Sequence, residues 1–348
     1  MKIAFLINRL ETERADYTTT RLSRIASRRG HEVFLIGLDG LIYDPSGEVC
    51  AMATRVGDTG FDNDADFLEE IQNNREPERI RVDGCDVLML RSDPADELGE
   101  RDWAPAAGLL FAQLAADHGV IVLNDPGHLT DAVNKTYFQK FPAAVRPETL
   151  ITREPDEVKR FLDGQPERRA VIKPLQGSGG QGVFILDRDN RQNLNQIIDA
   201  VTRDGYAIVQ EYLPAAANGD TRMITLNGKP LRVDGVYACL RRFSQSEDAR
   251  SNVSAGGGVE MIEPDEAMLR VAELAAPKMI QDGMYLCGLD VVGEKMMEIN
   301  VDTPGGINFL EDLSGVDFCG AILDDLERKV WLRAQYRGRL SNRQLAVT

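Results

Sequence analysis

Three oxygen-bearing side chains interrupt the apolar residues near the end of the chain. Asp290, Glu298 and Asn300 fall in two hydrophobic segments, 286–292 and 296–301, which we expect to be neighbouring strands. Glu298 and Asn300 are two residues apart, so their side chains leave the same face of a strand. Two carboxylates and an amide oxygen, with no sulfur or imidazole nearby, suit a hard cation such as Mg²⁺. The alternative is a solvent-facing acidic patch, which would place acids in otherwise apolar strands.

The turn between these strands decides whether Asp290 joins the other two residues. A two-residue turn, 293–294, would pair Asp290 with Met297 and point its side chain away from Glu298. A three-residue turn, 293–295, would pair Asp290 directly with Glu298. We predict the three-residue turn, because it gathers the acidic groups on one side of the strand pair.

A glycine-rich loop earlier in the chain could hold phosphate groups. Four of the residues 177–182 are glycine, which allows backbone N–H groups to approach an anion. The spacing matches G-x-G-x-x-G, but that dinucleotide fingerprint must lead into a helix, whereas residues 183–186 predict a strand. Lys173 lies on the strand before the loop, as a lysine does beside the ATP phosphates in kinases. From these residues alone, a phosphate-binding hairpin and an ordinary flexible hairpin both stay open.

Composition restricts the possible partners. The chain has 348 residues, 43% hydrophobic and 28% charged, and a net charge of −16. This charge disfavours nonspecific binding to nucleic acid or to an anionic membrane. The sequence contains no run of about 18 apolar residues, the length needed to span a bilayer. The five cysteines and three histidines are scattered, which argues against a zinc site, a disulfide framework or a serine–histidine triad. We expect a cytoplasmic protein that binds neither nucleic acid nor membrane.

The elements that position these residues predict an α/β fold. Strands and helices alternate up to about residue 125, as in a parallel sheet with crossover helices. Arg91, Ser92 and Asp93 end one strand, where ligands gather in such sheets, although they could be only a polar turn. We expect a capped helix over 129–138, a hairpin turn at 227–228 and a flap over 243–257.

The expected organisation has four segments. These are an N-terminal α/β domain (1–125), a unit with the glycine-rich loop (126–205), a unit with the flap and metal site (206–335), and a frayed tail (336–348).

These features together resemble the ATP-grasp superfamily and, within it, the bacterial glutathione synthetase family. The resemblance runs from about residue 86 to about residue 308 in the same order. It implies an ATP-grasp fold preceded by a Rossmann-like parallel α/β domain. The matching blocks are Asn134-Lys135, Lys173-Pro174-Leu175, the glycine-rich loop, 210–214, 219–222, 250–252, 255–257, 288–290 and 298–301. Each block is modest evidence, but their ordered co-occurrence is specific.

The resemblance also implies a role for each group of residues. Arginines, with planar guanidinium groups, would contact the anionic substrates, and whether Arg241 or Arg242 faces the site stays open. The implied ATP contacts are Lys135, Lys173, Gly177, Ser178, Gly179, Gly180, Gln210, Glu211, Tyr212, Leu213 and Asp220. The implied metal ligands are Asp290, Glu298 and Asn300; the catalytic residues are Arg222, Arg242, Arg250 and Asn252; the substrate contacts are Arg91, Thr303, Gly305 and Gly306.

The reaction implied is carboxylate–amine ligation with ATP and Mg²⁺, or Mn²⁺. A carboxylate attacks the γ-phosphate to give an acyl phosphate and ADP, and an amine then displaces phosphate. Phosphoryl transfer needs positioning and charge neutralisation rather than a side-chain nucleophile. The family makes glutathione from γ-glutamylcysteine and glycine, and its members are typically homotetramers, so we expect a homo-oligomer.

Two segments depart from the family pattern, and both lie on the substrate side. Where the family has Thr-Ser-Pro-Thr after 300–301, this chain has Asp302-Thr303-Pro304-Gly305, and Asn8-Arg9-Leu10 replaces Met-Asp-Pro. A lost hydrogen bond to a substrate carboxylate would cost about 1–3 kcal/mol. A sibling ligase with another donor or acceptor is therefore the main alternative. A non-catalytic ATP-binding regulator is a third, although it need not retain the metal ligands and both lysines.

Overall fold

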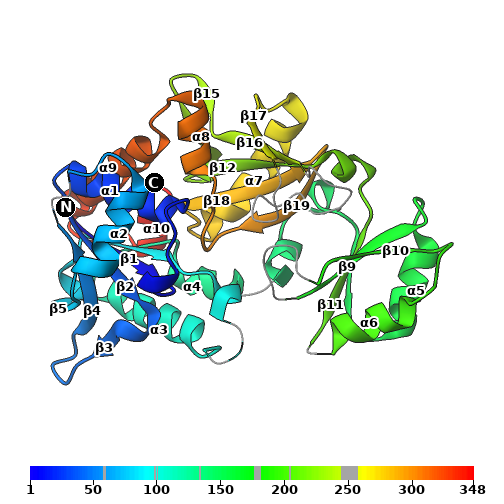
Figure 1. Ribbon diagram of the computed structural model, residues 1–348, viewed down its shortest axis with the longest axis horizontal. Helices are drawn as coiled ribbons and strands as arrows, with labels where there is room; N and C mark the ends of the chain where they lie inside the picture. The colour runs from blue at the N-terminus through cyan, green and yellow to red at the C-terminus, as the bar shows by residue number, and fades with distance from the viewer. Residues whose placement is uncertain are drawn as a thin grey trace.

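The described residues form three main sheets, which follow one another along the chain (Figure 1). This computed structural model describes residues 1–57, 60–97, 99, 101–132, 135–175, 182–203, 205–243 and 258–348. The middle sheet stands apart on the right of Figure 1, whereas the first and third share a continuous apolar core. No helix in these ranges is both long and apolar enough to cross a membrane.

The N-terminal sheet has the strand order β3-β4-β2-β1-β6-β7, with β5 beside β4. Strands β2, β1, β6 and β7 are parallel, which confirms the predicted α/β fold, and β4 runs antiparallel to β2. The strands are β1 (Lys2–Ile7), β2 (Glu32–Gly37), β3 (Leu41–Tyr43), β4 (Val49–Val56), β5 (Glu78–Arg81), β6 (Val87–Arg91) and β7 (Ile121–Leu123). The helices are α1 (Thr18–Arg28), α2 (Asp64–Asn74), α3 (Ala104–Asp117) and α4 (Pro126–Leu129).

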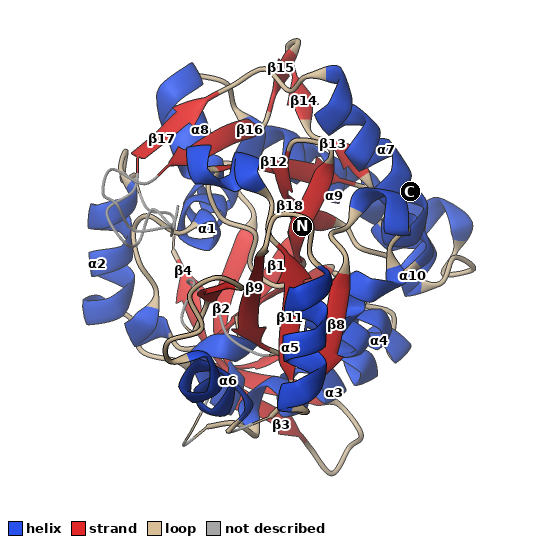
Figure 2. Cartoon of the chain, turned by 90° about the vertical axis from the view of Figure 1, so that its right-hand side faces the viewer, coloured by secondary structure: helices blue, strands red, loops and turns tan. Residues whose placement is uncertain are grey.

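The middle sheet is antiparallel, in the order β10-β9-β11-β8. Helices α5 and α6 pack on it and enclose a separate apolar core; Figure 2 views this unit from its own side, with both helices towards the reader. Because β11 pairs with both β8 and β9, the sheet extends past residue 205, where we expected the middle segment to end. The elements are β8 (Thr149–Thr152), α5 (Pro155–Gly164), β9 (Arg169–Pro174), β10 (Phe184–Asp187), α6 (Leu194–Thr202) and β11 (Ala207–Glu211).

The segment between the first two sheets differs from the prediction. We expected one helix over 129–138, but α4 ends at Leu129 and is followed by short 3-10 segments, Thr130–Ala132 and Lys135–Lys140. Residues 133–134 lie outside the described ranges. The Lys135 N–H donates to the Leu175 carbonyl (3.2 Å), so the chain here follows the end of β9 rather than continuing a helix.

The C-terminal sheet has the order β17-β16-β12-β18-β19, with β13 beside β12. The predicted turn at Asn227-Gly228 is confirmed, with positive φ at both residues (54° and 76°). Its strands are β12 (Asp220–Leu226), β13 (Lys229–Pro230), β16 (Cys239–Phe243), β17 (Gly258–Met261), β18 (Leu286–Val292) and β19 (Lys295–Asn300), beside the small pair β14 (Arg232–Val233) and β15 (Val236–Tyr237). The helices are α7 (Glu266–Gln281), α8 (Ile307–Ser314), α9 (Phe318–Tyr336) and α10 (Asn342–Ala346).

Two asparagines join the N-terminal sheet to the rest of the chain. The Asn124 side chain, just after β7, donates to the Val301 carbonyl (2.5 Å) and accepts from the Tyr285 N–H (2.7 Å). Asn342 in α10 exchanges two hydrogen bonds with the backbone of Val122 (2.8 and 2.9 Å). The expectation of a frayed tail is therefore wrong, because α10 is capped and its Leu345 is buried.

Candidate active site

One face of the C-terminal sheet gathers the charged residues predicted for the site. Strand register places Arg222 of β12 opposite Asp290 of β18, and Asp290 opposite Glu298 of β19. Asn300 lies two residues along β19, opposite Gly288. Because side chains alternate along a strand, these groups share one face. We call this row, Arg222, Asp290, Glu298 and Asn300, the metal face.

The pairing of Asp290 with Glu298 was predicted correctly, but the predicted turn is wrong. The connection has two residues, since β18 ends at Val292 and β19 begins at Lys295. Val291 pairs with Met296, and the register then shifts so that Asp290 pairs with Glu298. Met297 is thus the extra residue of a β-bulge, which turns the following side chains to the other face. The bulge, not the turn, brings the two acids together.

Asp290 accepts hydrogen bonds from three side chains. Arg222 binds it through two N–H groups (both 2.8 Å), the Arg242 guanidinium lies 2.8 Å away, and the Asn300 amide donates at 3.2 Å. Burial opposes ionisation of Asp290, but the two guanidinium groups outweigh it and hold its pKa well below the usual range. Asp290 is therefore an ionised, fully engaged carboxylate.

The question between Arg241 and Arg242 has a clear geometric answer. Arg242 is buried and pairs with Asp220 and Asp290, so it points to the metal face. Arg241 alternates to the outer face of β16, where it is exposed and pairs with Glu260 (2.9 Å). Of the two arginines, Arg242 is therefore the one on the same side of the sheet as Asp290.

Two lysines from other parts of the chain converge on Glu298. Lys135 Nζ lies 2.6 Å from Glu298 Oε1, and Lys173 on β9 is close enough to interact electrostatically with Glu298 and Lys135. Burial opposes ionisation of Glu298, but the two ammonium groups outweigh it and lower its pKa. Burial lowers the pKa of Lys173, with Glu298 opposing that change. Strand β9 ends one residue after Lys173, at Pro174.

The metal face also offers oxygen atoms with free coordination capacity. Glu298 Oε2 and Asn300 Oδ1 have no hydrogen-bond partner within the described ranges, because Lys135 takes Oε1 and the Asn300 amide nitrogen donates to Asp290. An all-oxygen donor set fits a hard divalent cation. Asp290 would have to release part of its bonding to an arginine before it could ligate the same ion.

The segment 210–213, predicted to contact ATP, lies at the end of β11. Gln210 is buried and donates to the Thr149 hydroxyl (3.2 Å). The Glu211 carboxylate accepts from the Glu148 N–H (3.0 Å), and the Arg169 guanidinium lies 5.6 Å from the centre of the Tyr212 ring. Leu213 follows directly, where the chain leaves the middle sheet. The contact of Glu211 with Glu148 ties this segment to the start of β8, and its contact with ATP stays a prediction.

Arg91 meets the 302–306 segment, although the two are far apart in sequence. Its Nε donates to the Thr19 hydroxyl (3.0 Å) and its Nη2 to the Pro304 carbonyl (3.2 Å). Thr303, Gly305 and Gly306 flank that proline and are half-buried, and α8 begins at the next residue. The end of β6 is thereby held against the segment that departs from the family pattern.

Three acidic residues lie near Arg91, and only Asp93 among them was a candidate from the sequence. Burial and the nearby Asp93 raise the pKa of Asp302 to about 8, with Arg91 opposing. Burial raises the pKa of Asp93, which also interacts with Lys135 and Glu298. Glu13, in the loop after β1, interacts with Arg91. No periodicity marks Glu13 or Asp302 in the sequence, whereas the position of Asp93 at the end of a strand had already made it a candidate.

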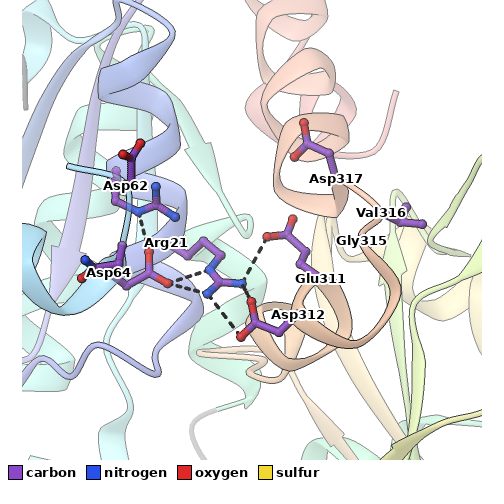
Figure 3. Close-up of a pocket in the computed structure, with 10 residues that line it drawn as sticks. Arg21, Asp62, Asp64, Glu311, Asp312, Gly315, Val316 and Asp317 are labelled. Atoms are coloured by element: carbon purple, nitrogen blue, oxygen red, sulfur yellow. Dashed lines mark hydrogen bonds and ion pairs between the residues drawn. The ribbon is translucent and has the colours of Figure 1, made fainter. Parts of the chain in front are cut away.

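A surface hollow of about 420 Å³ lies away from this site, between α1, α2 and α8. Figure 3 shows Arg21 of α1 reaching between Asp64 on one side and Glu311 and Asp312 on the other. Arg21 lies 2.6 Å from Asp64 and 2.7 Å from Asp312, and it also donates to the Asn308 carbonyl (2.9 Å). This network fixes α8, and with it the 302–306 segment, to the N-terminal domain.

Six predicted site residues lie outside the described residues. These are Gly177, Ser178, Gly179 and Gly180 of the glycine-rich loop and Arg250 and Asn252 of the predicted flap. Their assignment stays a prediction.

Comparison with known proteins gives the family. Residues 1–130 match the family model of the prokaryotic glutathione synthetase N-terminal domain, and 134–315 match that of its ATP-grasp domain. A glutathione synthetase of Gloeobacter violaceus is 32% identical over 330 residues, 93% of this chain and 96% of that protein. That of Vibrio parahaemolyticus is 29% identical over 309 residues, 88% and 90% of the two chains.

Solved structures are similar in fold. D-cycloserine synthetase DcsG has a TM-score of 0.62 at 17% identity and covers 93% of this chain and 99% of its own. ATP-grasp ligase PsnB, complexed with a minimal precursor, has a TM-score of 0.57 at 18% identity and covers 94% and 98%. The predicted ATP-grasp fold and family are both confirmed. The chain belongs to the prokaryotic glutathione synthetase family and is an ATP-dependent ligase.

Proposed function

We propose that this protein joins γ-glutamylcysteine and glycine to make glutathione, with release of ADP and phosphate. The observation that carries the proposal is the joining of three charged groups at one place. Three groups of charged residues meet around Glu298, and together they come from all three sheets. They are the metal face with Arg242, the lysines Lys135 and Lys173, and Asp93 just after β6. The names of the relatives supply the substrates.

The lysines and arginines would bind the anionic groups. Lys135 and Lys173 would hold the phosphates of ATP, and Gln210, Glu211, Tyr212, Leu213 and Asp220 would form the rest of the nucleotide site. Arg222 and Arg242 now donate hydrogen bonds to Asp290. They would exchange some of these for hydrogen bonds to the transferred phosphoryl group and the acyl phosphate. Guanidinium groups suit this exchange because their planar forks bind carboxylate and phosphate alike.

Glu298, Asn300 and Asp290 would hold the divalent cation, which we take to be Mg²⁺, with Mn²⁺ able to replace it. When bound, the cation neutralises phosphate charge as the γ-phosphoryl group moves to the carboxylate. Gly177, Ser178, Gly179, Gly180, Arg250 and Asn252 would cover the acyl phosphate, because this intermediate hydrolyses when water enters. Arg91, Thr303, Gly305 and Gly306 would bind the peptide substrate.

The proposed domain limits follow the sheets. The N-terminal domain ends near residue 125, and the middle unit, expected to end at 205, extends through β11. The expected homo-oligomer would be tested by light scattering on the purified protein.

The test is ADP release with γ-glutamylcysteine and glycine, together with the mass of the product. Lys173→Met and Glu298→Gln should each remove activity by more than about 100-fold while the protein stays folded. Lys140→Met and Glu294→Gln are matched controls, since both residues are exposed and outside the site. Full activity in either site variant would contradict the assignment.

A second function is favoured by one observation. Asp302 replaces a hydroxyl residue of the family and lies near Asp93 and Arg91. A ligase with a different amine or acid is therefore the alternative. Dependence of ADP release on an amine other than glycine, with no glutathione formed, would support it.

A further inference from the structure

Lys135 belongs to a segment that lies outside the three sheets and the long helices. It opens the short 3-10 segment Lys135–Lys140, between α4 and β8. Its ammonium nevertheless lies 2.6 Å from Glu298 Oε1 on β19. A lysine side chain has many rotamers, so holding its charged end at one point requires a well-fixed backbone. The contacts of the 3-10 segment therefore show what holds Lys135 in place.

Tyr137, two residues after Lys135, is anchored by a buried hydrogen bond. Its hydroxyl donates to Asp282 Oδ2 (2.8 Å), and the two residues are only 2% and 1% exposed. The Tyr137 ring packs edge-on against Phe141, with the ring centres 5.4 Å apart. A 3-10 helix has three residues per turn, so Lys135 and Tyr137 leave different sides of the segment. Tyr137 can therefore point into the core while Lys135 points to the metal face.

Asp282 is a buried carboxylate with a donor on each oxygen. Tyr137 donates to Oδ2, and Lys278, one turn earlier along the chain, donates to Oδ1 (2.8 Å). Burying a carboxylate is costly even when it has partners, and an apolar pair would serve packing alone as well. Burial and the nearby Asp282 raise the pKa of Tyr137, so its hydroxyl stays protonated and remains a donor at neutral pH. The bond is thus a specific link between two segments.

This link connects the Lys135 segment to the C-terminal sheet. Asp282 lies where α7 ends and the chain turns back into β18 of the metal face. On the other side of the segment, the Lys135 N–H donates to the Leu175 carbonyl (3.2 Å), next to the end of β9. The segment is therefore tied to both sheets whose charged residues meet around Glu298, and Tyr137 supplies a tie to the sheet with the metal face.

We propose that Tyr137 and Asp282 are positioning residues that hold Lys135 in place for the phosphates of ATP. Without the Tyr137 hydroxyl the 3-10 segment can shift, and the Lys135 ammonium then moves away from the phosphates. A misplacement of about 1 Å in such a group can cost about 100-fold. The inference rests on the proposed function in one respect, the assignment of Lys135 as a phosphate contact.

The test is a double-mutant cycle between Tyr137→Phe and Lys135→Met. The measured quantity is the Kd for ATP with Mg²⁺, by titration calorimetry without the other substrates. Alone, Tyr137→Phe should weaken binding by about tenfold, because the ring keeps its packing but loses the bond to Asp282. In the Lys135→Met background the same change should weaken binding by less than about twofold, because no ammonium is left to position. A merely structural role would weaken binding equally in both backgrounds.

Tyr285→Phe is the matched control. The Tyr285 hydroxyl is also buried and donates to a carbonyl, that of Ile322 in α9 (3.1 Å). This variant should unfold at lower urea concentration than wild type and keep the wild-type Kd for ATP. If Tyr137→Phe does not fold, Asp282→Asn replaces it in the cycle, because an amide is a weaker acceptor for the Tyr137 hydroxyl than a carboxylate. The same criteria then apply.

The outcomes separate this inference from the proposed function. An unchanged Kd in Tyr137→Phe, or equal losses in the two backgrounds, overturns the inference, and glutathione formation by wild type leaves the function standing. The expected coupling supports the inference even if wild type makes no glutathione, because ATP binding is measured without the other substrates. If Lys135→Met leaves the Kd unchanged, Lys135 is not a phosphate contact and the inference is overturned.

Discussion

Glu13 is 9% exposed, and its Oε2 has no hydrogen-bond partner among the described residues, so removing its charge should make the ligand-free protein more stable. The pKa of this carboxyl rises from 4.5 to about 7 in the folded protein, chiefly because of burial. Between these pH values the folded state holds a proton that the unfolded state has lost, so wild type loses stability as pH rises through that window. Glutamine has no proton to lose, so Glu13→Gln escapes this loss.

The size of the effect follows from the width of the window. About 2.5 pH units at about 1.4 kcal/mol each give about 3 kcal/mol. Glu13→Gln should therefore match wild type near pH 4 and exceed its free energy of unfolding by about 3 kcal/mol at pH 8.

The assay is urea unfolding, followed by tryptophan fluorescence at pH 4, 6 and 8. Glu11→Gln is the control, because it makes the same change at an exposed position and should stay within about 0.5 kcal/mol of wild type. A Glu13→Gln effect that is equal at all three pH values, or of opposite sign, would refute the claim that burial outweighs the favourable interactions of this carboxylate.

Three further predictions concern other parts of the molecule. Arg222→Lys should lower kcat by more than about tenfold with a smaller change in KM for ATP, because a lysine cannot reproduce the two parallel bonds to Asp290; an unchanged kcat in steady-state assays would contradict this. Gly219→Ala should lower the free energy of unfolding by more than about 2 kcal/mol, because the new Cβ would lie 2.0 Å from a carbonyl of β16. Gly235→Ala is the control and should cost about 1 kcal/mol, because Gly235 has a similar φ but no atom closer than 4.0 Å. Equal losses in the two variants would refute the clash. Arg21→Met should lower the free energy of unfolding by about 1–3 kcal/mol, because it removes the cation between Asp64 of α2 and Glu311 of α8. An unchanged free energy in urea unfolding would show that the network contributes nothing.

The sequence predicted the chemistry of the metal face better than its geometry. Asp290, Glu298 and Asn300 could be identified because acids in apolar strands have few structural roles. The bulge at Met297 could not, because nothing in the local residue types distinguishes it from a longer turn. Likewise, alternation along β16 puts Arg241 and Arg242 on opposite faces, but only the partner strand shows which face is the site.

Other differences between prediction and structure arose where tertiary contacts override the local conformational preference of the residues. The apolar spacing over 129–138 is typical of a helix, yet the Lys135 backbone bonds to Leu175 instead. The tail was predicted to fray, although Ser341 and Gln344 form a capping box that the sequence already contained. Nothing in the sequence indicates that Glu13 is buried, because a single acid in a loop belongs to no periodic pattern.

The bulge at Met297 makes the hairpin tip independent of the acids below it. The bulge sets the pairing of Asp290 with Glu298 within the strand and not at the turn. Residues inserted at Gly293-Glu294 therefore need not rotate Asp290 away from Glu298. Relatives with hairpin tips of different length could thus keep the same ligand geometry, and their sequences are best aligned from the acids outward. For protein engineers, the tip is a place to attach a reporter without disturbing the reacting groups.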